Sequence, residues 1–206
     1  MAHDGSMTMT DSPVLGDLLT LTGAAIAPLE ALLDTAKTKV RDRVSDGARV
    51  SGALIEAEQT ATHGLAWLAT YVEALRQMQG WAVRLDADGK FGETEALILQ
   101  ITFGEYLWQV YGGLPMSQTE ILRPQDIGLS QDDQRAMMAP AGMTLTQDGN
   151  TQAARLRLVE LMRAQAGSAT VGNSGLDEEF EMIRAQFVRF VRARVLPDAH
   201  EWPLKD

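Results

Sequence analysis

The fold is decided by residues 50–85, which read VSGALIEAEQTATHGLAWLATYVEALRQMQGWAVRL. Apolar side chains recur every three or four positions along this stretch, which is the spacing of one helix face. These positions are Val50, Leu54, Ala57, Ala61, Leu65, Leu68, Tyr71, Val72, Leu75, Met78, Ala82 and Leu85. Charged and amide side chains occupy the other face, which indicates a half-buried helix. The pattern predicts one helix of about ten turns that forms the spine of a helical bundle.

Two more long helices are predicted beside this spine. Residues 13–44 carry a second apolar stripe, and Ser12-Pro13 is a favourable helix start. Pro28 lies inside this stripe, so we expect either a kink or two helices that meet near Ala27. A turn at 45–47 then makes the first helix and the spine an antiparallel hairpin. Residues 93–111 are apolar almost all round, which predicts a buried helix with a close crossing at Gly104.

Shorter helices are expected in the rest of the chain. Residues 130–133 are typical of a helix start, and that helix should stop before Pro140. Another helix is predicted over residues 151–166, and its apolar face is Ala154, Leu158, Leu161 and Met162. The last helix, residues 176–195, begins with acids and ends with arginines, which complements the helix dipole. We find no internal repeat and no strand pattern, so the predicted fold class is all-α, an antiparallel helical bundle.

The composition narrows the classes of partner. The chain has 206 residues, a net charge of −10 and a pI near 4.8, which argues against nucleic acid or an anionic membrane. Acids outnumber bases in residues 1–150, whereas the two are equal in 151–206. There is no cysteine, which removes disulfides and thiolate chemistry. No apolar run approaches the roughly 20 residues of a membrane span, and the polar N-terminus is unlike a secretory signal, so we expect a cytoplasmic protein.

Few side chains are suited to catalysis or metal binding. His63 lacks the Glu-x-x-His or His-Glu-x-x-His spacing of metal sites. The acidic loop 86–93 looks like a calcium loop, but Phe91 and Leu97 stand where an EF-hand needs glycine and glutamate. Glu105 is expected to be partly buried and to pair with a base or a backbone donor. Five aromatic residues could line a pocket, although aromatics at helical spacing are more often core. They are Trp67, Tyr71, Trp81, Trp108 and Tyr111. We predict no catalytic, cofactor-binding or metal-binding residue in this chain.

A family resemblance begins in the last helix. Residues 183–202 read IRAQFVRFVRARVLPDAHEW, an arginine-rich amphipathic helix followed by Val195, Pro197, Ala199 and Trp202 in order. This segment resembles the first helix of the acyl-CoA dehydrogenase family and its exit. Pro203 departs from the family pattern, in which a non-proline is expected.

The preceding residues extend the resemblance. The segments 49–54 (RVSGAL), 63–75 (HGLAWLATYVEAL), 103–107 (FGEYL) and 112–118 (GGLPMSQ) resemble the helical N-terminal extension of bacterial (2S)-methylsuccinyl-CoA dehydrogenases, a branch of that family. The resemblance implies a flavoenzyme that oxidises (2S)-methylsuccinyl-CoA to mesaconyl-CoA. It implies a glutamate base, FAD as hydride acceptor and electron-transfer flavoprotein as electron acceptor. The family's site residues match no position of this chain, so we expect no FAD and no activity in it alone.

The resemblance also implies a domain organisation. We expect a flexible leader at 1–12, a helical extension at 13–166, a linker at 167–175 and the truncated start of the dehydrogenase helical domain at 176–206. The full-length protein should be a homo-oligomer. A second hypothesis is a free-standing helical binding or oligomerisation domain. Under the first hypothesis, Phe180, Phe187, Phe190 and Val191 either dock back onto the bundle or lie exposed as an association patch.

Overall fold

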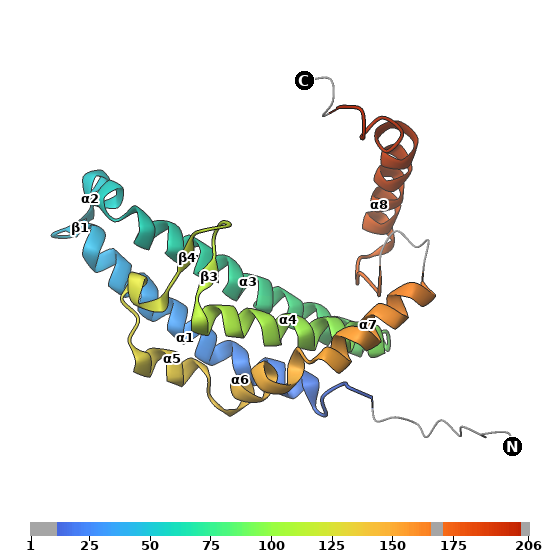
Figure 1. The fold of residues 1–206 in the computed structure, drawn as a ribbon, viewed down its shortest axis with the longest axis horizontal. Coiled ribbons are helices and arrows are strands. Elements are labelled where there is room, and N and C mark those ends of the chain that lie inside the picture. Colours follow the sequence, from blue (N-terminus) through green and yellow to red (C-terminus); the bar gives the residue numbers. More distant parts are fainter. Residues whose placement is uncertain (1–11, 166–170, 203–206) are drawn as a thin grey trace, which may run out of the picture.

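The computed structural model describes residues 12–165 and 171–202. Figure 1 shows a helical bundle from which one helix, α8, stands away. The described residues contain eight α-helices and two short strand pairs, so the prediction of an all-α fold is confirmed. The strand pairs were not predicted: β1 (Ser45–Asp46) with β2 (Arg49–Val50), and β3 (Leu114–Pro115) with β4 (Ile121–Leu122).

The centre of the bundle is the predicted helical hairpin. Helix α1 (Leu18–Val44) and helix α3 (Gln59–Ala87) run antiparallel and make the most extensive contact in the fold (Figure 1). Pro28 lies inside α1, which stays one helix. The predicted start at Ser12-Pro13 is wrong, because α1 begins after Asp17. The physical reason is that the buried amide of Gln100 binds the backbone before α1: it accepts from Leu15 N–H at 2.9 Å and donates to Pro13 O at 2.9 Å.

The spine helix is shorter than predicted. A separate helix, α2 (Gly52–Ala57), precedes α3, and the break lies at Glu58, where φ is −107° and ψ is 34°. Val50 belongs to β2 and is 57% exposed, so the first part of the predicted stripe is not core. Ser51 accepts from Leu54 N–H at 3.5 Å and starts α2 locally. The stripe is confirmed from Ala61 onward. Its buried members are Ala61, Leu68, Tyr71, Val72, Leu75, Ala82 and Leu85.

Helix α4 (Glu93–Gly112) packs along this hairpin almost as predicted. The chain leaves α3 through Gly89, whose φ of 67° suits glycine, and Lys90 N–H donates to Leu85 O at 2.8 Å. The predicted close crossing at Gly104 is confirmed. A Cβ on Gly104 would lie 2.7 Å from Leu145 O, in the short helical turn η2 (Leu145–Gly149).

Residues 116–150 are more helical than predicted. Following η1 (Pro124–Ile127), helix α5 (Gln131–Met137) is capped by Ser130 as expected, and Asp133 N–H donates to Ser130 Oγ at 3.1 Å. Helix α6 (Pro140–Thr144) was not predicted after the expected stop before Pro140. The short turn η2 replaces most of the turn that was predicted over residues 147–150. Gly149 permits this packing, since a Cβ there would lie 2.8 Å from Gln100 O. These short helices cover one side of α1 and α4.

Two helices complete the described chain. Helix α7 (Gln152–Ala164) packs on α4 through Ala154, whereas Met162 of its predicted apolar face is 43% exposed. Helix α8 (Glu178–Phe190) continues into a wide turn, η3 (Val191–Val195). Most of the predicted leader, and residues 167–170 of the predicted linker, lie outside the described residues.

Among the described residues, α1 has the length and composition of a membrane span. This corrects the expectation that no apolar stretch approaches that length, and the reason is that the charges of α1 gather after Leu29. Its buried side packs on α3, α5 and α6. The core helix of a soluble protein meets the same criterion, so this similarity is weak evidence for a span.

Candidate functional site

The five aromatic residues singled out in the sequence do not gather in one pocket. Tyr71 packs against Tyr106 with ring centroids 4.5 Å apart, and its hydroxyl donates to Gln109 Oε1 at 2.6 Å. Burial raises the pKa of Tyr71, and the neighbouring Tyr106 and Glu105 raise it further. Trp108 donates to Thr146 O at 2.9 Å at another helix contact. The aromatic residues therefore join helices in separate places, with Trp67 beside Tyr71 and Tyr111 beside Trp108.

His63 has a structural neighbour. Its Nε2 accepts from the indole N–H of Trp67 at 3.0 Å, one helical turn away on α3. Within residues 12–165 and 171–202, no group of three or more histidine, aspartate and glutamate side chains could hold a metal ion. The acidic loop 86–93 serves as the turn between α3 and α4. The prediction of no catalytic, cofactor or metal residue stays a prediction for the chain as a whole.

The buried acid is not the predicted one. Glu105 is exposed and accepts from the amides of Gln109 at 2.6 Å and Asn150 at 2.8 Å. Glu95 of the same helix is 7% exposed, and its Oε2 accepts from Gly92 N–H at 3.1 Å. Sequence reasoning chose the wrong acid because α4 is apolar almost all round, so its pattern does not show which side meets water.

An ion pair ties α7 to the beginning of α4. Arg157 Nε donates to Glu93 Oε1 at 2.9 Å, and Arg157 Nη2 donates to Glu93 Oε2 at 2.7 Å. This bidentate contact lowers the pKa of Glu93 and raises that of Arg157. Both side chains remain partly accessible, so the pair positions α7 and does not form a buried charge site.

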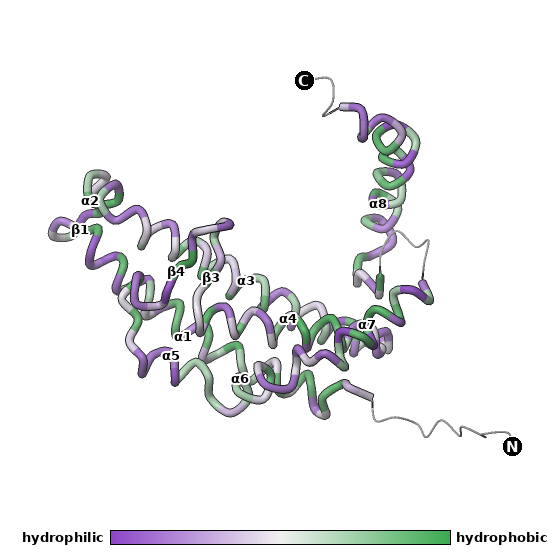
Figure 2. The backbone as a smooth tube through the Cα atoms, in the orientation of Figure 1, coloured by the Kyte–Doolittle hydropathy of each residue, from purple (hydrophilic) through white to green (hydrophobic). Residues whose placement is uncertain are grey.

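The most conspicuous surface of the molecule is one face of α8. Asp177 caps the helix by accepting from Phe180 N–H at 3.0 Å, and acids follow in the first turn. Phe180, Phe187 and Phe190 recur on one side and are 56%, 66% and 58% exposed. We call this side, together with Ile183 and Val191, the α8 apolar face. Figure 2 shows apolar and polar residues alternating along α8. Of the two predicted outcomes for this face, the structure has the exposed one.

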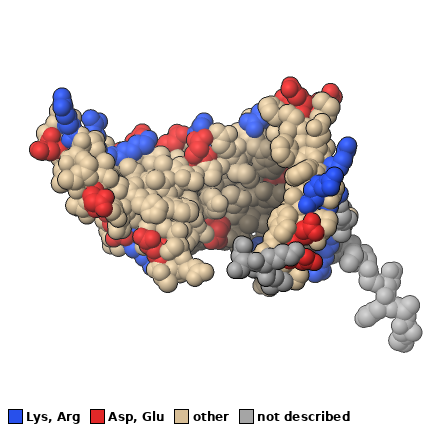
Figure 3. All heavy atoms as spheres, turned by 90° about the horizontal axis from the view of Figure 1, so that it is seen from above, with Lys and Arg blue, Asp and Glu red and all other residues tan. Residues whose placement is uncertain are grey.

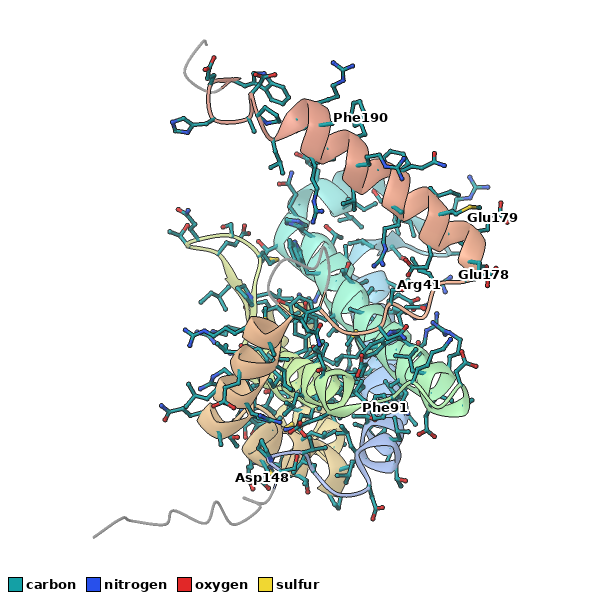
Figure 4. All side chains as sticks on the ribbon, turned by 90° about the vertical axis from the view of Figure 1, so that its right-hand side faces the viewer. Arg41, Phe91, Asp148, Glu178, Glu179 and Phe190 are labelled. Carbon is teal, nitrogen blue, oxygen red and sulfur yellow. The ribbon has the colours of Figure 1, made fainter. Side chains whose placement is uncertain are left out.

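Arginines occupy much of the remaining surface of α8. A shallow hollow on this helix is lined by Arg184, Ala185, Val188, Arg189, Arg192 and Ala193. Figure 3 shows the open space between α8 and the bundle, and Figure 4 shows Glu178 and Glu179 at one end of α8 with Phe190 toward the other. The lining residues come from α8 and its continuation η3 alone, so this hollow has one wall.

The segment before α8 is held on the bundle. Asn173 N–H donates to Glu95 Oε1 at 2.6 Å, and the indole N–H of Trp81 donates to Asn173 O at 3.0 Å. Sequence reasoning missed this contact, because the glycines and serines of 167–175 are typical of flexible chain. The one signal available was an asparagine between glycines, a composition that also suits a tight turn.

Nearly the whole chain has a counterpart in a known enzyme. Over 198 residues, or 96% of its length, it is 56% identical to (2S)-methylsuccinyl-CoA dehydrogenase of Cereibacter sphaeroides. The chain is similar to an N-terminal part of that dehydrogenase. It spans 35% of the length of this relative, and no protein-family model matches it. The resemblance to methylsuccinyl-CoA dehydrogenases noted in the sequence is thereby confirmed.

Proposed function

We propose that this chain is the N-terminal helical part of an FAD-dependent acyl-CoA dehydrogenase. The full-length protein would oxidise (2S)-methylsuccinyl-CoA to mesaconyl-CoA and pass electrons to electron-transfer flavoprotein. The observation that carries this proposal is the 56% identity over 198 residues to an enzyme of that name. The proposed divisions are a leader at 1–12, an extension at 13–166, a linker at 167–175 and the start of the dehydrogenase domain at 176–206.

The proposal assigns the described residues a structural role. A ligand the size of a flavin is normally enclosed by several elements, which bury most of its surface. The hollow on α8 is lined only by that helix and its continuation η3, and so does not fit such a group. Under this proposal, the described residues of this chain take part in no chemical step. The reacting groups would belong to the part of the dehydrogenase for which the chain has no counterpart.

The α8 apolar face fits this proposal. Three exposed phenylalanines on one helix are more than single scattered apolar residues, and such patches mark contact surfaces. Following helices of the dehydrogenase domain would cover this face in the full-length protein. The extension would then form a separate bundle on the N-terminal side of that domain in the sequence.

The test uses the complete reading frame that contains this sequence. The purified product should show a flavin absorption spectrum and convert (2S)-methylsuccinyl-CoA to mesaconyl-CoA with an artificial electron acceptor. The 206-residue chain alone should bind no flavin when incubated with FAD. A reading frame without a dehydrogenase after residue 206, or a full-length product without turnover, contradicts the proposal. Flavin bound stoichiometrically to the short chain contradicts the assignment of the site.

The same α8 apolar face favours one alternative, a free-standing helical domain that associates through it. A stop codon directly after Asp206 would support this alternative. Sedimentation of the 206-residue chain would then give a dimer or larger oligomer, and Phe187→Asp would restore the monomer.

A further inference from the structure

The segment between the bundle and α8 is held by specific contacts at both ends. We call residues 171–177 the connector. On the bundle side, Glu95 and Trp81 together satisfy both backbone groups of Asn173: the carboxylate accepts its N–H at 2.6 Å, and the indole donates to its C=O at 3.0 Å. Glu95 comes from the first turn of α4 and Trp81 from the last turns of α3, so two bundle helices bind the backbone of one residue.

The two glycines of the connector let it lie close to these helices. Gly172 has a φ of 74°, and a Cβ there would lie 3.1 Å from Glu95 Oε1. Gly175 has a φ of 69°, and a Cβ there would lie 3.2 Å from the Trp81 ring. Residues other than glycine rarely adopt such positive φ values, and a β-branched residue almost never does. The glycines are therefore needed for this bound conformation.

Hydrogen bonds continue from Asn173 into α8. Gly175 N–H donates to Asn173 Oδ1 at 3.0 Å, and Leu176 N–H donates to Ser174 Oγ at 3.2 Å. The Ser174 hydroxyl donates to Glu181, which lies in the first turns of α8. These contacts fix the backbone at several successive positions, so little freedom remains between the bundle and α8. Figure 1 shows the result, with α8 rising from the end of the bundle where α3 meets α4.

We propose that the connector is a rigid joint that sets the orientation of α8 relative to the bundle, with Glu95 and Trp81 as its receptor. The proposal differs from the expectation of a flexible linker for residues 171–175. Under the proposed function, the joint would hold the extension in one orientation on the dehydrogenase domain. That role rests on the proposed function, whereas the fixed orientation is a property of the 206-residue chain and is tested on it without any activity measurement.

The first experiment measures the orientation of α8 directly. The chain has no cysteine, so spin labels can be placed specifically on Thr70→Cys in α3 and Gln186→Cys in α8, both exposed positions. Double electron–electron resonance should give one narrow distance distribution. Adding Gly172→Val should broaden this distribution. Valine cannot adopt the φ of Gly172, so the backbone must change and the connector must leave Glu95 and Trp81. Gly47→Val is the matched control: Gly47 has a φ of 64° with open space around it, far from the connector, and the distribution should stay narrow.

The second experiment measures the contact of the connector with its receptor. It does not use the glycine variant, so it remains informative if that variant fails to fold. Trp81→Phe removes the indole donor and keeps an aromatic ring. Glu95 still binds the Asn173 amide hydrogen in this variant, but the lost hydrogen bond from Trp81 to Asn173 O lets the connector leave the bundle more often. Exchange of this amide hydrogen, followed by NMR, should therefore become about fivefold faster. Trp67→Phe removes an exposed indole hydrogen bond to His63 and should leave this rate unchanged. A broad distribution in the parent chain, or unchanged exchange in Trp81→Phe, overturns the proposal. Neither result bears on whether the full-length protein is a dehydrogenase.

Discussion

The crossing of α4 and η2 at Gly104 makes a quantitative prediction about stability. Alanine is normally better than glycine inside a helix by about 1 kcal/mol. At Gly104, however, a Cβ would lie 2.7 Å from Leu145 O and 2.8 Å from Asn150 N. Both are backbone atoms that cannot rotate away, so the two helical segments must separate. Overpacking of this kind costs about 1–3 kcal/mol.

Gly80 in α3 provides the matched control. A Cβ there would meet the end of the Arg84 side chain at 3.4 Å, an ordinary contact with a flexible group. Gly80→Ala should therefore stabilise the chain. In Gly104→Ala the gain in helix propensity is the same, but the cost of overpacking should offset or outweigh it. We expect the free energies of unfolding of the two variants to differ by about 1–3 kcal/mol, with Gly104→Ala the less stable.

Urea unfolding followed by far-UV circular dichroism measures this difference, provided that the m-values of both variants are equal. The thermal midpoints should differ by roughly 2–4 °C per kcal/mol for a chain of this size. If Gly104→Ala is as stable as Gly80→Ala, the close approach of α4 to η2 is refuted.

Three other predictions follow from contacts described above. Gln100→Leu removes the amide that binds Pro13, Leu15 and Gly149, and should lower the free energy of unfolding by about 2–4 kcal/mol. Urea unfolding measures this change. As a control, Gln77→Leu on the exposed face of α3 should change the same free energy by less than about 0.5 kcal/mol. The pair with Arg157 lowers the folded-state pKa of Glu93 below its ordinary value of 4.5, so its contribution is present above that value and is lost as the pH falls through the folded pKa. Unfolding titrations from about pH 7 to about pH 3 should therefore show a smaller loss of stability in Arg157→Ala than in the parent. An equal loss of stability in the two proteins would contradict this, and Arg163→Ala should behave like the parent. Phe187→Asp should leave the melting temperature of the bundle nearly unchanged, because this side chain is exposed, while Phe103→Ala in the core should cost about 3–5 kcal/mol; a large effect of Phe187→Asp would show that α8 packs elsewhere in solution.

Local patterns predicted the parts of the fold that local physics controls. The burial of Ala61 to Leu85 follows from apolar spacing alone, because any helix with this stripe must cover it. Gly104 was identified because glycine inside a long apolar helix is unfavourable unless something approaches closely. The Ser130 cap is likewise contained in a few adjacent residues.

The errors arise where distant residues decide the local structure. Ser12-Pro13 is a good helix start, but Gln100, 85 residues from Leu15, binds the backbone there and α1 begins later. Glu95, not Glu105, is buried because the connector arrives from position 173 to cover it. The α8 apolar face was predictable as a face, but its sequence does not state which partner covers it.

Glu95 accepts hydrogen bonds from two backbone amides, Gly92 at the beginning of α4 and Asn173 in the connector. One side chain thus links the start of a bundle helix to the attachment of the next segment. For chimeric proteins this decides where a junction belongs. A fusion point before residue 171 separates Glu95 and Trp81 from the peptide they bind, while a fusion point after Asp177 transfers receptor and connector as one unit.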